Sequence, residues 1–173
     1  MKHMVEIVAI LSATPSTFRA MLLNLPDRLI THNECDESWC PFDIVGHLIH
    51  GDKTDWIPRL HRILELGETE PFMPFDRFTQ FKDSEGKTLT ELLDAFEKLR
   101  RDNLEELKSL HLTEKQLYLT GTHPELGIVT IRQLLHTWAV HDMSHLAQTA
   151  RVISRQYSDD VGPWKDYIPI VNK

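Results

Sequence analysis

The sequence predicts an all-α fold, a four-helix bundle with a long crossover connection, and two observations lead to it. Four long segments repeat their apolar residues every three to four positions, which is the period of an amphipathic helix. Between the second and the third of them, residues 67–87 contain too much proline and glycine to form a helix. Four amphipathic helices with one long connection are typical of a bundle. We expect a single domain over residues 1–173.

The first two predicted helices each contain a proline. The first covers about residues 4–24, and we expect a break near Pro15, because proline has no N–H for the helical hydrogen bond. An irregular polar segment, residues 27–40, follows. The second helix covers about residues 41–66, and Pro58 should kink it or divide it in two.

The last two predicted helices have clear starting signals. The third covers residues 88–110 and opens with the pattern of a capping box, Thr-Leu-Thr-Glu. The fourth covers residues 130–157, starts at a threonine cap and contains neither glycine nor proline. Between these helices, residues 118–129 should form a short hairpin or an ordered loop, and the last sixteen residues an irregular tail.

The composition argues against several classes of partner. Acidic residues outnumber basic ones by 26 to 19, a formal net charge of −7, whereas proteins that bind nucleic acid normally present a basic face. No run approaches the ~20 apolar residues of a membrane span, and the first residues lack the features of a secretory signal. Two cysteines, Cys35 and Cys40, cannot build a disulfide framework. We therefore expect a cytoplasmic protein with no nucleic-acid and no membrane partner.

Histidine is abundant, with ten in 173 residues, and His141 and His145 are the most informative pair. Four residues apart on a helix, they differ by about 40° in direction and can reach one point. They share a stripe with Leu134 and Trp138, which should face the core. Two imidazoles there are costly unless each is hydrogen-bonded or both share a cation. A hydrogen-bonded pair at the core edge and a pair of metal ligands both fit this pattern.

A metal site needs further ligands, and the second predicted helix offers His47 and His50. They lie three residues apart, and Gly46 and Gly51 beside them would let another helix approach closely. If this helix packs against the fourth, either histidine could complete a set of three. Three neutral imidazoles with an open position are typical of a catalytic divalent metal, whereas structural zinc is usually closed by four protein ligands.

A zincin-like site is a second way to complete the set, because residues 141–145 have the spacing of H-E-x-x-H with Asp142 in place of the glutamate. No histidine or glutamate follows residue 145, so only aspartates remain as downstream ligands. Their side chains are shorter than that of glutamate, which argues against zincin chemistry.

Two stretches of the chain resemble a known family. They are residues 39–48, Trp-Cys-Pro-Phe-Asp-Ile-Val-Gly-His-Leu, and residues 135–148, Leu-His-Thr-Trp-Ala-Val-His-Asp-Met-Ser-His-Leu-Ala-Gln. Together they are similar to the DinB-like (DinB/YfiT) metalloenzymes. In that family, one histidine of the second helix and an H-x3-H pair of the last helix bind a divalent metal. The resemblance therefore implies that His47, His141 and His145 are the metal ligands.

The resemblance also implies a chemistry. Some relatives are thiol S-transferases, and one was first described as a metal-dependent hydrolase. We expect Zn²⁺, Ni²⁺ or Fe²⁺ to activate a nucleophile for attack on a small-molecule substrate. A low-molecular-weight thiol, and hence S-transfer, is the leading expectation; water and hydrolysis are the alternative, as is a non-enzymatic metal- or small-molecule-binding bundle. His50 and Asp52 are the candidate catalytic residues, which would orient a ligand or shuttle a proton. Family members commonly pair, so we expect a homodimer.

Two groups of arginines are expected at the surface. Arg59 and Arg62 follow Pro58 and should lie at a solvated helix end. Arg100 and Arg101 lie among many charged residues and should belong to an exposed helix face.

Overall fold

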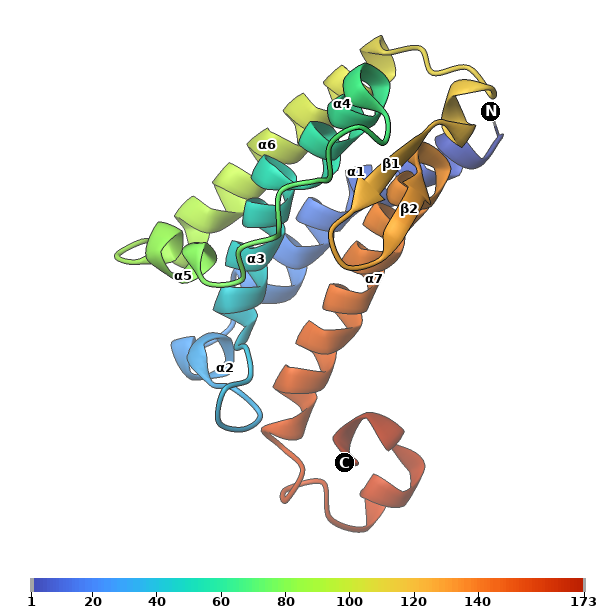
Figure 1. Ribbon diagram of the computed structural model, residues 1–173. Helices are drawn as coiled ribbons and strands as arrows, with labels where there is room; N and C mark the ends of the chain where they lie inside the picture. The colour runs from blue at the N-terminus through green and yellow to red at the C-terminus, as the bar shows by residue number, and fades with distance from the viewer. Residues whose placement is uncertain (1, 173) are drawn as a thin grey trace.

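The computed structural model describes residues 2–172, and their architecture is the expected all-α four-helix bundle (Figure 1). The helices and strands are α1 (Lys2–Leu22), α2 (Asp27–Thr31), α3 (Pro41–Thr54), α4 (Trp56–Leu66), α5 (Thr79–Ser84), α6 (Leu89–Ser109), β1 (Thr120–His123), β2 (Gly127–Thr130) and α7 (Ile131–Arg155). Three short 3₁₀ helices are η1 (Gln116–Tyr118), η2 (Gly162–Tyr167) and η3 (Pro169–Val171). The bundle consists of α1, α3 continued by α4, α6 and α7.

The long helices bury their apolar stripes in two separate clusters along the bundle. α1 and α3 each pack against both α6 and α7, and α4 continues the contact with α7. One cluster surrounds Leu60 and Trp138, and the other surrounds Phe18 and Phe96. Between the clusters, the inward positions of α3, α6 and α7 hold buried polar residues instead. The candidate functional residues belong to this polar layer.

Helix α1 contradicts the expected break at Pro15, because it continues through this residue without interruption. Proline cannot donate to the carbonyl four residues earlier, which is that of Leu11. In the structure, Arg100 Nη1 donates to the Leu11 carbonyl oxygen at 3.0 Å in its place. One residue before the proline, the Thr14 hydroxyl donates to the Ile10 carbonyl at 3.0 Å. A side chain from α6 therefore compensates for the missing backbone donor.

Pro58 divides the second long helix as expected, and the break lies at Asp55, between α3 and α4. A proline ring clashes with the carbonyl of the residue four positions earlier, here Thr54, which is the last residue of α3. The division places Asp55 at the junction of two helices. Arg59, which we expected in solvent, is buried and pairs with Asp55, with 2.5 Å between Nε and Oδ1.

The connecting segments contain more regular structure than the sequence predicts. The crossover over residues 67–87 was expected to contain no helix, yet it includes α5. Asp76 precedes this helix and orders its start, since its Oδ1 accepts from the backbone N–H groups of Phe78 and Thr79 at 2.8 and 3.1 Å. Short α2 lies within the segment expected to be irregular. Of the two alternatives for residues 118–129, the hairpin is present, with antiparallel strands β1 and β2.

By length and composition alone, residues 4–22 of α1 could cross a membrane, with a mean hydropathy of 1.2. Polar residues interrupt this segment, so it is not a continuous apolar run of the kind considered in the sequence. Core helices of bundles satisfy the same test. Leu11, Phe18 and Leu22 of α1 are fully buried in the bundle.

Arg100 is the second surface arginine that the structure places elsewhere, because only 1% of it is exposed. Its guanidinium donates to both carboxylate oxygens of Asp52, at 2.8 and 3.0 Å, and to both of Asp142, at 2.5 and 3.2 Å. With the bond to Leu11, all five N–H groups of the arginine are used. Arg100 thereby links α6 to α1, α3 and α7. Arg101 is exposed, as expected.

Candidate metal centre

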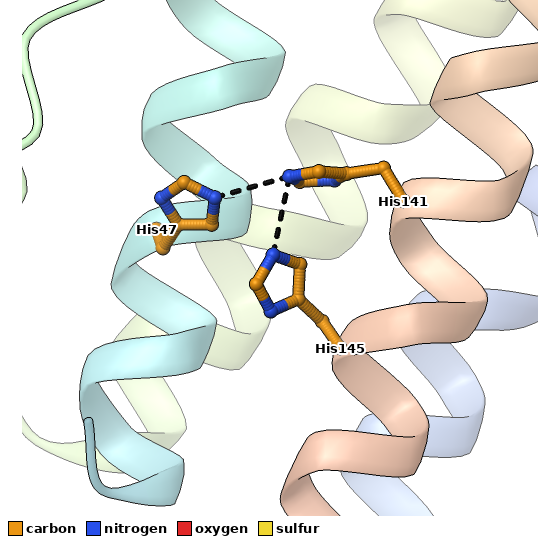
Figure 2. A group of neighbouring side chains, drawn as sticks. All are labelled: His47, His141 and His145. Carbon is orange, nitrogen blue, oxygen red and sulfur yellow. Dashed lines mark hydrogen bonds between the residues drawn. The ribbon is translucent and has the colours of Figure 1, made fainter. Parts of the chain in front are cut away.

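Three histidine side chains from two helices converge in the polar layer (Figure 2). His47 projects from α3, and His141 and His145 project from successive turns of α7. The Nε2 atom of His141 lies 3.1 Å from that of His47 and 3.1 Å from that of His145. The ligand atoms of all three residues lie within 4.8 Å of one another. The structure thus brings together the three side chains that the sequence singles out as ligands.

Two glutamines orient the outer rings of the cluster. Gln80 Oε1 lies 2.9 Å from Nδ1 of His47, and Gln148 Oε1 lies 2.8 Å from Nδ1 of His145. An amide oxygen only accepts, so each Nδ1 carries the proton and each Nε2 keeps a free lone pair. Gln148 lies on α7, one turn beyond His145. Each glutamine therefore holds its histidine ring so that the Nε2 of the ring, with its lone pair, points to the centre of the cluster.

Gln80 reaches His47 because α5 lies directly on α3. A Cβ atom added to Gly46 would meet Ser84 Oγ of α5 at 2.5 Å, so a side chain at this position would have to displace the Ser84 hydroxyl. The expected role of Gly46 in close packing is confirmed, although the approaching helix is the short α5 and not a bundle helix. Sequence reasoning missed Gln80, because the crossover has no apolar period that would indicate which side chains point inward.

The histidines are held in their neutral form. Burial, and to a smaller extent the charges of neighbouring imidazoles, lower the pKa of His47 to about 4 and that of His141 to about 3. Burial also lowers the pKa of His145. All three rings are neutral at pH 7, which is the state in which imidazole binds a metal.

The cluster fits a divalent cation in both distance and charge. Two imidazole nitrogens on a tetrahedral Zn²⁺, each about 2.0–2.1 Å from the ion, are about 3.3 Å apart, close to the 3.1 Å seen here. Without a cation, the Nε2 of His141 faces two acceptor nitrogens and can donate to only one of them. A shared cation would satisfy all three lone pairs.

A cleft of about 300 Å³ opens beside the histidines. The ring of Trp39 lies 4.5 Å from that of His47, and the ring of Phe75 meets His47 edge-on at 5.4 Å. Trp56 contacts His141 in the same way at 5.1 Å. The rest of the lining consists of His145, Gly51, Asp55 and Arg77. The open side of the cluster therefore has mostly aromatic walls.

The two candidate catalytic residues lie apart from the cleft lining. His50 is buried, its ring lies 5.1 Å from that of Phe75, and its Nδ1 has no hydrogen-bond partner among residues 2–172. Asp52 bonds to Arg100 and accepts from Trp138 Nε1 at 3.2 Å. The catalytic roles of His50 and Asp52 stay predictions, and the observed contacts of Asp52 are those of a structural residue.

Asp142 does not support the zincin-like alternative. Its side chain is fully buried and points to Arg100, on the side of α7 that faces α6. A zincin base would have to face the point at which His141 and His145 converge, and Asp142 does not. The cluster is instead completed by His47, from a helix far away in the sequence.

Comparisons with known proteins agree with this architecture. The model of the DinB superfamily matches residues 10–149. A solved structure, YfiT from Bacillus subtilis, superposes with a TM-score of 0.74 at 22% identity, over 87% of this chain and 85% of that chain. YfiT is described as "a probable metal-dependent hydrolase with an unusual four-helix bundle topology". At this identity the likeness shows a shared fold. A search of curated proteins gave no match.

Proposed function

We propose that this chain, which belongs to the DinB superfamily, is a metal-dependent enzyme in which His47, His141 and His145 hold one divalent ion. The observation that supports the proposal is the convergence of their three ligand atoms within 4.8 Å. Three protein ligands leave part of the coordination sphere open, which is the pattern of a catalytic site. Zn²⁺, Ni²⁺ and Fe²⁺ all accept imidazole nitrogen.

Hydrolysis and thiol transfer are the two candidate reactions. When bound, a divalent ion lowers the pKa of water or of a thiol, so that a nucleophile is available near neutral pH. The description of YfiT supports water, and therefore hydrolysis, as the reaction. The family resemblance supports S-transfer from a low-molecular-weight thiol to an electrophile. In both reactions the aromatic cleft would receive a small molecule and exclude bulk water from the reacting atoms.

The metal site is tested by measuring metal content. We expect the protein, purified without a histidine tag, to contain about one divalent ion per chain by mass spectrometry, as three ligands of one site imply. His47→Ala and His141→Ala should lose the ion. His32→Ala is the matched control, because His32 is exposed outside the cluster and should not matter. Full metal content in both site variants would refute the proposed centre.

The reaction is tested with two substrate panels on the metal-loaded protein. Turnover of esters or amides without added thiol would identify a hydrolase. Thiol consumption that requires an electrophile would identify a transferase. In either case His141→Ala should abolish turnover. A protein that holds its full metal content and turns over neither panel would contradict an enzymatic role and favour a binding function.

The setting of the enzyme is a further part of the proposal. The near absence of cysteine and the acidic composition favour the cytoplasm, and the family resemblance favours a homodimer. Light scattering coupled to size-exclusion chromatography should give twice the chain mass of 20.1 kDa. A mass equal to one chain would overturn the dimer.

A further inference from the structure

Arg77 lines the cleft beside the histidine cluster, and a second arginine, Arg59, pairs with a residue of the lining. Arg59 reaches Asp55 of the cleft lining and pairs with it, so these two charges offset each other. Arg77 also lines the cleft, and no hydrogen bond or ion pair to it is found within residues 2–172. A guanidinium in this position is a ready partner for an anion.

Arg77 belongs to an ordered segment of the crossover that is tied to α3 on both sides. Before it, the ring of Phe75 packs on the rings of His47 and His50, at 5.4 and 5.1 Å. After it, Gln80 of α5 bonds to His47. The carboxylate of the neighbouring Asp76 is already used, because it accepts hydrogen bonds from Phe78 and Thr79 at the start of α5. The backbone that carries Arg77 is therefore fixed at the cleft.

The remaining walls of the cleft suit an apolar body. Trp39, Trp56 and Phe75 present aromatic rings, and each of them lies within 5.4 Å, ring to ring, of a histidine in the cluster. The volume of about 300 Å³ is at the lower end of the range for small-molecule sites. A single planar guanidinium matches a carboxylate, which it can bind through two parallel hydrogen bonds.

We propose that the cleft binds a small organic acid with an apolar or aromatic body, whose carboxylate pairs with Arg77 while the body lies against Trp39, Trp56 and Phe75. This inference rests on the proposed function, because it assigns the substrate class of the same site. It makes Arg77 a specificity-determining residue. The end of the substrate away from the carboxylate would then face the three histidines.

The test compares two probes of equal shape, phenylacetate and its neutral amide, phenylacetamide, on the metal-free protein. Removing the metal prevents a carboxylate from binding to the ion, so that only the protein walls are tested. Binding is followed by tryptophan fluorescence, since Trp39 and Trp56 lie in the cleft. We expect phenylacetate to bind at least about tenfold more tightly than phenylacetamide, as a charge-assisted pair implies.

Variants of the arginine assign the binding to this residue. Arg77→Gln should weaken phenylacetate binding about tenfold and leave phenylacetamide binding unchanged, and Arg77→Lys should restore part of the difference. Arg101→Gln, an exposed arginine outside the cleft, should have no effect. Equal binding of the two probes, no saturable binding of phenylacetate, or an unchanged Arg77→Gln variant would each overturn the proposal. None of these results depends on metal content, so a failure of the proposed metal centre is recognised separately.

Discussion

The polar layer of the bundle holds two clusters that are built in opposite ways. In the Arg100 cluster, formed with Asp52 and Asp142, five N–H donors meet five acceptor oxygens from three residues, the third being Leu11. In the histidine cluster, the acceptor nitrogens face one another. Both clusters connect α3 with α7, and they share neighbours on α7, where Asp142 follows His141.

The difference separates structure from function. Buried polar groups in folded proteins are normally satisfied by hydrogen bonds, and the Arg100 cluster obeys this rule without any added group. The histidine cluster obeys it only in part, since the Nε2 of His141 can donate to only one of its two neighbours, whereas a cation would satisfy all three nitrogens. The fully buried Arg100 cluster and the partly buried histidine cluster therefore carry different expectations. Removal of a partner should cost stability in the first and ligand binding in the second.

The largest effect should follow from Arg100→Met. The variant leaves the carboxylates of Asp52 and Asp142 buried without their cation, and breaking a buried ion pair in this way costs about 3–5 kcal/mol of unfolding free energy. It also leaves the Leu11 carbonyl beside Pro15 without its donor. Urea unfolding monitored by circular dichroism measures the loss.

The control for this experiment is the adjacent Arg101→Met. Arg101 is exposed, so the unfolding free energy of this variant should stay within about 0.5 kcal/mol of the wild-type value. If Arg100→Met lost as little unfolding free energy as Arg101→Met, the Arg100 cluster would not be important for the stability of the fold.

A smaller effect, on binding and not on stability, should follow from Gln80→Ala and Gln148→Ala. Each variant removes the oxygen that holds one Nδ1 proton, and loss of such a partner typically weakens metal affinity about 10–100-fold. Competition with a chromophoric zinc chelator gives the dissociation constant. Gln148→Glu keeps an acceptor oxygen and should retain the affinity.

Gln156→Ala is the matched control for the two glutamines. Gln156 caps the C-terminal end of α7, far along the helix from the histidines, and bonds to the Leu29 carbonyl. Its removal should leave zinc affinity unchanged. Equal affinities in Gln80→Ala, Gln148→Ala and the wild type would show that the rings do not need these partners to bind metal.

The two clusters also differ in how far the sequence predicts them. The i, i+4 spacing of His141 and His145 on an apolar stripe is enough to indicate that both side chains face the inside of the bundle. Arg100 was misjudged because its neighbours are charged, although it occupies the stripe between Phe96 and Leu104, where an inward side chain is expected. Its place on this apolar stripe was therefore the sequence signal that Arg100 is buried.

Other features depend on contacts between distant segments and left no local signal. Pro15 predicts a helix break by itself, and the donor that satisfies the Leu11 carbonyl in the continuous α1 comes from Arg100, on a helix far along the chain. Gln80 and Arg77 lie in a crossover without period, so their inward and cleft-facing positions follow from the packing of α5 on Gly46. Local patterns therefore predicted the bundle and the His141/His145 pair, the family resemblance pointed to His47 as the third ligand, and neither indicated the partners that orient the rings.

The pH dependence of stability sharpens the comparison, because the two clusters should respond with opposite signs in the metal-free protein. The pKa values of His47 and His141 are about 4 and about 3 when folded, against an ordinary value of 6.5. Below pH 6.5 these histidines bind more protons in the unfolded chain than in the folded one. Their effect is therefore to lower the stability of the folded protein as the pH falls. Burial raises the pKa of Asp52 to about 6 from 3.8, so its folded form gains protons, and stability, over pH 6 to 4.

The double variant His47→Gln/His141→Gln separates the two contributions. Without the histidines, the loss of stability between pH 7 and pH 5 should be smaller than in the wild type, and the opposite contribution of Asp52 should remain. Urea midpoints at pH 7, 6 and 5 in the presence of chelator measure the difference. If the wild type and the double variant lost stability equally, the histidines would have to titrate normally in the folded protein, and burial would not be what keeps them neutral and ready to bind an ion.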